Sequence, residues 1–276
     1  MEISTKSINQ SLNLYSIFGY LLPGFFLVTL LIIDYDFSKV MREYSSRKHI
    51  TLEIIQSIDL KINYILSYFS KGTMQDFKII PFIIFIFFCY LLGHIISAIS
   101  SLLLERLIVK KILGYPSQNL ISFKDKIKYP LFFGSFRRSF KSQFIGHLKQ
   151  MINDNFGYTA NKEDYYWLCY SEIITKRPYL TARIHHFVNL YGFSRNITAA
   201  LIIYLFIRFF ILNLLLGSTM DFFSWITWTS LFICAFFMFW NYLKLFKRQA
   251  VDIYFLFLST INTENKTISK IEENEL

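Results

Sequence analysis

The chain has few cysteines and lacks the motifs that identify common catalytic and nucleotide-binding sites. Cys89, Cys169 and Cys234 lie far apart, and their spacing matches neither a metal site nor a disulfide framework. We find no nucleophile elbow, P-loop, dinucleotide fingerprint or zinc-protease motif. We therefore expect no metal, no cofactor and no catalytic residues, and predict that the protein is not an enzyme.

Acidic residues are missing from four long apolar runs, at residues 14–33, 79–104, 197–217 and 222–243. Each run reaches the roughly 20 residues that a helix needs to cross a bilayer. Hydrophobic residues make up 54% of the chain, and its mean hydropathy is +0.38. These features predict a multi-pass membrane protein. The first run does not resemble a cleaved signal peptide, so we expect it to remain in the protein.

The positive charge of the chain is concentrated between the second and third runs. Residues 105–196 contain fifteen basic and six acidic residues, whereas residues 34–78 contain seven and six. Because basic loops stay in the cytoplasm, we predict cytoplasmic termini and a cytoplasmic insert at 105–196, with 34–78 outside. The expected fold is an all-α integral membrane protein of four transmembrane helices. Residues 1–33 hold the N-terminus and first span, and 244–276 a cytoplasmic helix and tail.

Apolar periodicity predicts further helices outside the four runs. The loop at 34–78 has a helical stripe. In the insert, we expect helices over 136–152 and 164–175, and a third that starts after Pro178 and runs into the third span. Gly114 to Ser117 should break the helix that precedes them. We also expect a separate helix at 245–261, followed by a frayed polar tail.

Arg208 lies near the middle of the third apolar run, with Asn213 as its only strongly polar neighbour in the run. A guanidinium at this depth costs about 2.5–3.5 kcal/mol on insertion scales, so it tends to face a bundle interior or water. Three outcomes stay open. In the first, Arg208 lines an aqueous path in an oligomer; in the second, it binds an anion or lipid phosphate; in the third, it extends toward the membrane surface.

Polar residues also interrupt the second run. His94, Ser97 and Ser101 share one face of a helix. Such a face indicates either close helix packing, with hydroxyls bonded to a neighbour, or a polar pore lining. We expect His94 and Arg208 at similar depths, where a neutral His94 could accept a hydrogen bond from Arg208.

The first run contains Gly19, Pro23 and Gly24, which should kink or loosen its helix. The bend either lets the helix pack against its neighbours or acts as a gating hinge.

The insert contains a basic set that we expect on an anionic surface or a partner protein. Contact with anionic lipid headgroups explains such charge best, and nucleic acid or a nucleotide is the less favoured alternative. The set comprises Lys124, Lys126, Lys128, Arg137, Arg138 and Lys141.

Four short phrases carry a resemblance: FGYLLPG at 18–24, YLLGH at 90–94, GYPS at 114–117 and YGFSRN at 191–196. Together they resemble poorly characterised bacterial four-span membrane proteins, some of which accompany antiphage defence genes. The resemblance implies a component of the bacterial inner membrane that senses, anchors or permeabilises. It supplies no catalytic site to carry over.

We therefore expect a bundle that self-associates in the cytoplasmic membrane. Its insert would receive a cytoplasmic signal or partner, and the bundle would then perturb or permeabilise the membrane. One alternative is a passive anchor or scaffold that recruits a cytoplasmic partner. A small-solute transporter is a third, less favoured because the sequence has no internal repeat.

Overall fold

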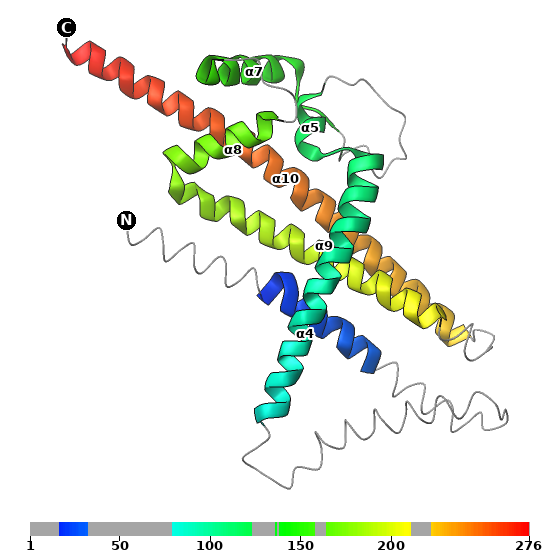
Figure 1. Ribbon diagram of the computed structural model, residues 1–276. Helices are drawn as coiled ribbons and strands as arrows, with labels where there is room; N and C mark the ends of the chain where they lie inside the picture. Colours follow the sequence, from blue (N-terminus) through cyan, green and yellow to red (C-terminus); the bar gives the residue numbers. More distant parts are fainter. Residues whose placement is uncertain are drawn as a thin grey trace, which may run out of the picture. The chain divides into compact units, whose positions relative to one another are not determined.

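The computed structural model describes residues 17–32, 79–122, 136, 138–157, 164–210 and 222–275, and all regular structure within them is helical (Figure 1). This confirms the predicted all-α class for that part of the chain. The chain divides into two compact units. Unit 1 comprises Met1–Ser16, Ser101–Arg195 and Phe239–Leu276, and unit 2 comprises Ile17–Ser100 and Asn196–Met238.

Three helices are long and apolar enough to cross a membrane: Phe82–Ile121, Pro178–Phe210 and Trp225–Thr263. They contain the second, third and fourth predicted spans apart from residues 79–81, 211–217 and 222–224. The first predicted span is represented by Gly19–Ile32, which is apolar but shorter. The structure thus supports a membrane protein, and the fourth crossing stays a prediction.

Unit 2 is built from apolar helices whose outward side chains are large and exposed. They are η1 (Ile17–Leu21), the helical residues 22–32, α4 (Ile79–Ser100), and the segments of α9 (Thr181–Phe210) and α10 (Phe222–Glu275) that belong to this unit. Residues 196–201 of α9 are all buried. Extended apolar surface of this kind marks a contact with membrane or protein. On α4 it includes Phe82, Ile83, Ile84, Phe87, Phe88, Leu91 and Ile95.

Two glycines bring the first helix of unit 2 against α4. A Cβ atom on Gly24 would overlap the backbone of Cys89, and one on Gly93 would overlap the backbone of Tyr20. Small residues at such a crossing let two helix backbones approach closely, which is a common way to pack helices in membranes. Gly24 therefore lies at a packing contact; whether Gly19, Pro23 and Gly24 also form a hinge stays a prediction.

Unit 1 begins with η3 (Ser101–Leu113), a π-helix. The amide of Gly114 donates a hydrogen bond of 2.6 Å to the Val109 carbonyl, five residues back. Gly114 has a φ of 76°, which glycine adopts at little cost, and the helix ends there. This confirms the predicted break. The next helix, α5 (Pro116–Ile121), has proline in its first turn, where no amide hydrogen is needed.

The two helices expected in the insert are present, one of them shorter than predicted. Helix α7 (Ser142–Phe156) starts six residues after Phe136, which packs instead with Val109 and Leu113. Helix α8 (Asp164–Lys176) matches the predicted range 164–175 almost completely. A turn of 3-10 helix, η4 (Pro178–Leu180), then leads into α9, so the prediction that a helix after Pro178 runs into the third span is confirmed up to Phe210.

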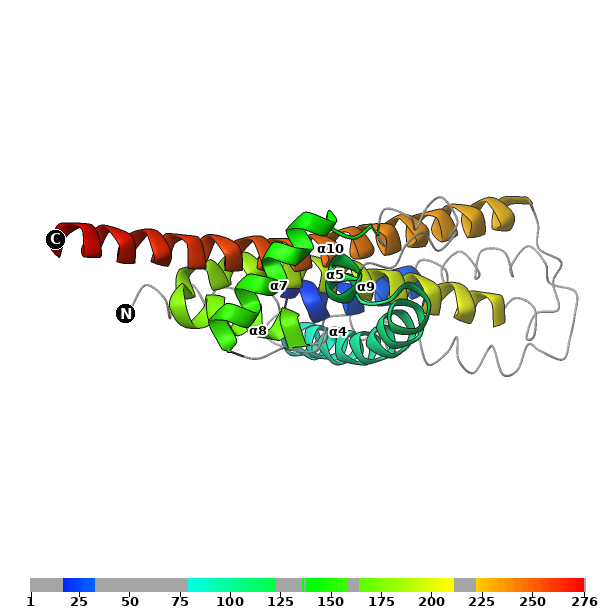
Figure 2. The same cartoon turned by 90° about the horizontal axis from the view of Figure 1, so that it is seen from above.

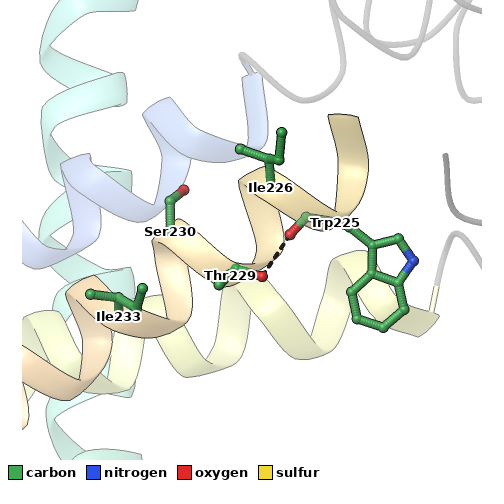
Figure 3. Close-up of a pocket in the computed structure, with 5 residues that line it drawn as sticks. All are labelled: Trp225, Ile226, Thr229, Ser230 and Ile233. Atoms are coloured by element: carbon green, nitrogen blue, oxygen red, sulfur yellow. Dashed lines mark hydrogen bonds between the residues drawn. The ribbon is translucent and has the colours of Figure 1, made fainter. Parts of the chain in front are cut away.

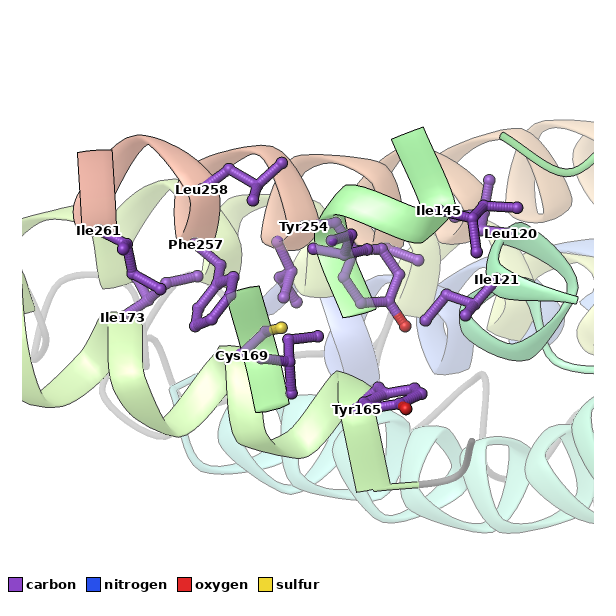
Figure 4. Close-up of a cluster of buried hydrophobic side chains, with 14 of the residues drawn as sticks. Leu120, Ile121, Ile145, Tyr165, Cys169, Ile173, Tyr254, Phe257, Leu258 and Ile261 are labelled. Carbon is purple, nitrogen blue, oxygen red and sulfur yellow. The ribbon is translucent and has the colours of Figure 1, made fainter. Parts of the chain in front are cut away.

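The core of unit 1 forms where α7 and α8 meet the C-terminal half of α10 (Figure 4). Tyr165, Cys169 and Ile173 recur every four residues on α8, as one buried helix face requires. In Figure 4 they point toward Phe257 and neighbouring side chains of α10. Burial in this cluster raises the pKa of the Cys169 thiol well above its ordinary value.

Helix α10 continues past the end of the fourth predicted span without a break (Figure 2). The separate helix expected at 245–261 is therefore the continuation of α10, and the tail expected to fray is helical to Glu275. The continuity has a physical reason: residues 244–249, KLFKRQ, include no glycine or proline that would end a helix.

Candidate functional site

A buried hydrogen-bonded network centred on Asn196 is the clearest polar feature of unit 2. Proline has no amide hydrogen, so Pro23 cannot donate to the carbonyl four residues earlier, which is that of Gly19. The side-chain Nδ2 of Asn196 donates to this carbonyl at 2.6 Å. Because an unpaired carbonyl is costly in an apolar interior, the Asn196 side chain gives the Gly19 carbonyl a donor where Pro23 cannot.

The other end of the Asn196 side chain is also bonded. Its Oδ1 lies 2.6 Å from the Ser100 hydroxyl, which in turn lies 2.9 Å from the Ser97 carbonyl. A serine has one hydroxyl hydrogen, so these two acceptors share it. Asn196 is 1% exposed and Ser100 is fully buried. One asparagine side chain thus ties α9 to α4 and to the turn at Gly19.

Arg208 belongs to the same unit and is buried, with 6% of its surface exposed. It lies one helical turn after Tyr204, which is also buried, whereas Phe206 between them is 70% exposed. The helix therefore turns an apolar face outward and directs its arginine inward. This is the placement expected for a charged residue within an apolar span. Asn213 lies outside the described residues.

The polar residues predicted on α4 are distributed over different environments. The His94 ring is exposed and stacks on Tyr20 with 3.9 Å between ring centroids, and Tyr90 meets it edge-on at 4.6 Å. Ser97 is half-buried, and its carbonyl accepts the Ser100 contact. Ser101 begins the next unit. That the three residues line one polar path stays a prediction.

Unit 1 contains a salt bridge close in sequence to this network. Arg195 Nη1 lies 2.5 Å from Glu105 Oε2, and Ser101 Oγ lies 3.5 Å from the same oxygen. Asn241 Nδ2 donates to the Ser194 hydroxyl at 2.9 Å. Glu105 is thus engaged by the arginine that directly precedes Asn196 in the sequence.

The predicted basic set of the insert is only partly described. Arg138 and Lys141 are exposed, and the Arg138 carbonyl accepts a hydrogen bond of 3.0 Å from Lys247 Nζ. Both side chains are accessible to a charged partner. The remaining members, Lys124, Lys126, Lys128 and Arg137, lie outside the described residues.

A shallow open pocket lies on α10 in unit 2 (Figure 3). All five lining residues come from this helix: Trp225, Ile226, Thr229, Ser230 and Ile233. The Thr229 hydroxyl donates to the Trp225 carbonyl at 2.8 Å, and the Ser230 hydroxyl donates to the Thr227 carbonyl at 2.9 Å. Because both hydroxyls are already bonded within their own helix, the described lining of the pocket presents no converging polar groups of the kind that orient a ligand.

Asn196 and the Glu105–Arg195 salt bridge are the elements that sequence reasoning missed. A partial signal for Asn196 was available, because Pro23 cannot donate to the Gly19 carbonyl and a polar residue of another helix can do so in its place. Its partner could not be identified from spacing alone. The pairing joins residues 177 positions apart.

The chain was also compared with known proteins. No protein-family model, curated protein or solved structure matches it. The resemblance to membrane proteins found beside antiphage defence genes therefore stays a prediction that rests on the four phrases alone.

Proposed function

We propose that the protein is a four-span, non-enzymatic component of the bacterial inner membrane that alters membrane permeability in response to a cytoplasmic signal or partner. Both termini and residues 105–196 lie in the cytoplasm in this proposal, and several copies associate in the membrane. The resemblance carried by the four phrases is the reason for proposing a role in antiphage defence.

The observation that carries the proposal is a buried charge in an apolar helical unit. Arg208 is directed inward on α9, and Asn196 on the same helix bonds to two other elements of the unit. Burying charged and polar groups is costly in a membrane, and such residues usually mark a pathway for ions or a site that changes state. A passive anchor needs stable helix packing, to which Asn196 contributes, but it has no need for the buried charge of Arg208.

Helices α9 and α10 each contribute residues to both units. A change in the environment of residues 181–195, which belong to unit 1, can therefore reach Arg208 through an unbroken helix. This covalent continuity gives a cytoplasmic event a route to the membrane residues.

The alternative is a scaffold that recruits a cytoplasmic partner. The observation in its favour is that unit 1 has its own apolar core and displays Arg138 and Lys141 on its surface. In a scaffold, substitutions on the surface of unit 1 would abolish function, and substitution of Arg208 would not.

Membrane potential in bacterial cells distinguishes the two functions. The full chain is expressed with and without its genomic neighbours, and a potential-sensitive dye is read before and after phage infection. Arg208→Leu and His94→Leu remove the predicted polar residues. Phe206→Leu, two residues from Arg208 and exposed, is the matched control.

We expect depolarisation with the unaltered chain and with Phe206→Leu, and its loss with Arg208→Leu. Full depolarisation by a variant with both Arg208→Leu and His94→Leu would exclude a polar pathway through these residues. An unchanged potential in every condition would favour the scaffold.

A further inference from the structure

The exposed side of η3 carries an apolar strip and a basic strip next to each other. Its buried side is formed by residues spaced four or five apart, as the wide turn of a π-helix requires: Leu104, Val109 and Leu113. The opposite side is exposed. Its apolar strip has the same spacing and consists of Leu103, Leu107 and Ile112, and its basic strip consists of Arg106, Lys110 and Lys111.

The nearest carboxylate in the sequence does not balance the positive charge of the basic strip, because it is paired with another residue. Glu105 is the only acidic residue in the sequence of η3, and it forms the salt bridge with Arg195. Among the described residues, no salt bridge involves Arg106, Lys110 or Lys111. Three cations therefore stand beside an exposed hydrophobic strip, and no anion within the described ranges forms an ion pair with them.

The position of η3 along the chain indicates which anion would neutralise these three cations. Helix α4 has 22 residues, which at about 1.5 Å per residue matches the roughly 30 Å thickness of the hydrocarbon core. The helix continues directly from α4 into η3 as part of Phe82–Ile121. If α4 crosses the membrane, η3 starts where the hydrocarbon ends and the lipid headgroups begin.

We propose that this face of η3 binds the phosphate groups of anionic phospholipids. Arg106, Lys110 and Lys111 contact the phosphates, and the strip at Leu103, Leu107 and Ile112 lies at the boundary with the acyl chains. Long basic side chains reach headgroups in this way while their stems cover apolar surface. A nucleic acid or an acidic protein would complement the cations but would leave the apolar strip in water.

The inference rests on α4 crossing the membrane, which is one part of the proposed function, and does not depend on a change in permeability. Its test uses the full chain in a neutral detergent. Native mass spectrometry measures how many phosphatidylglycerol or phosphatidylcholine molecules of equal chain length bind at increasing lipid concentration.

The test variant combines Arg106→Gln, Lys110→Gln and Lys111→Gln. All three side chains are exposed, so the fold should persist, and thermal unfolding checks this. The control removes three cations elsewhere in unit 1 with Lys149→Gln, Lys176→Gln and Arg177→Gln, and because Lys176 is salt-bridged to Glu172, its thermal unfolding is checked as well. Each cation near an anionic surface strengthens binding roughly fivefold, so three account for a factor on the order of 100.

We expect the unaltered chain and the control to prefer phosphatidylglycerol, and the test variant to lose most of this preference. Equal binding of the two lipids by the unaltered chain would overturn the proposal. So would a test variant that retains the preference, which would point to an acidic protein as the partner of the strip. These outcomes are read independently of membrane potential, so failure here is distinguishable from failure of the proposed function.

Discussion

Replacing Asn196 by leucine should destabilise the protein chiefly by removing the side-chain donor to the buried Gly19 carbonyl. Leucine keeps much of the volume of the side chain but makes neither of its two hydrogen bonds. A buried group left unsatisfied costs about 1–3 kcal/mol. The Ser100 hydroxyl still has the Ser97 carbonyl at 2.9 Å, so most of the loss should come from Gly19.

Pro23→Ala provides the decisive background for this prediction. An alanine at position 23 has an amide hydrogen that can bond to the Gly19 carbonyl, as in an ordinary helix. In that background, Asn196→Leu should cost only about 0.6 kcal/mol, the average for a hydrogen bond between helices in a membrane protein. The assay is a denaturing-detergent titration of all four proteins, followed by circular dichroism.

Asn241→Leu on α10 is the matched control, because Asn241 is exposed and donates one hydrogen bond. It should have a smaller effect, which does not depend on residue 23. An equal cost of Asn196→Leu in the two backgrounds would refute the reasoning, because it would show that the Gly19 carbonyl does not depend on Asn196.

Three further predictions concern packing and ionisation. Gly24→Ala should cost about 1–3 kcal/mol of unfolding free energy by forcing two backbones apart, whereas Gly146→Ala, with nothing within 4 Å of its added Cβ, should stabilise α7 by about 0.5–1 kcal/mol; thermal unfolding compares them. Phe257→Ala should cost about 3–5 kcal/mol because the side chain is fully buried, and the exposed Phe255→Ala less; equal effects on unfolding would contradict the assigned core. The raised pKa of Cys169 means that the folded chain keeps its thiol protonated while the unfolded chain ionises above about pH 8.5. Stability should therefore fall by about 1.4 kcal/mol for each pH unit above this value, and Cys169→Ala should remove that contribution to the measured pH dependence of unfolding.

Helix positions in this chain could be predicted from local pattern. The acidic residues Glu163 and Asp164 marked the start of α8, and Gly114 marked the end of η3, because both signals lie within a few residues of their effect. Phe136 shows the limit of the method. It fits the apolar period of α7 but packs with Val109 and Leu113, a choice that depends on tertiary contacts.

The candidate site was predicted less completely than the helices. The apolar run around Arg208 identified an expensive charge, and the structure places it in the interior of unit 2. The role of Asn196 depends on a carbonyl 177 residues away, and that of Glu105 on an arginine 90 residues away. No periodicity within the sequence encodes such pairs.

Water access to the buried face of α9 tests the central claim most directly. Tyr204→Cys lies on the Arg208 face, one turn away, and is buried, whereas Phe206→Cys lies on the exposed apolar face. Each is introduced after Cys89, Cys169 and Cys234 have been replaced by alanine in a chain that still depolarises cells. A membrane-impermeant thiol reagent is then added before and during depolarisation. We predict that Tyr204→Cys reacts only during depolarisation and that Phe206→Cys does not react. Equal labelling of the two positions, or none at Tyr204→Cys while the membrane depolarises, would contradict a polar pathway along this face.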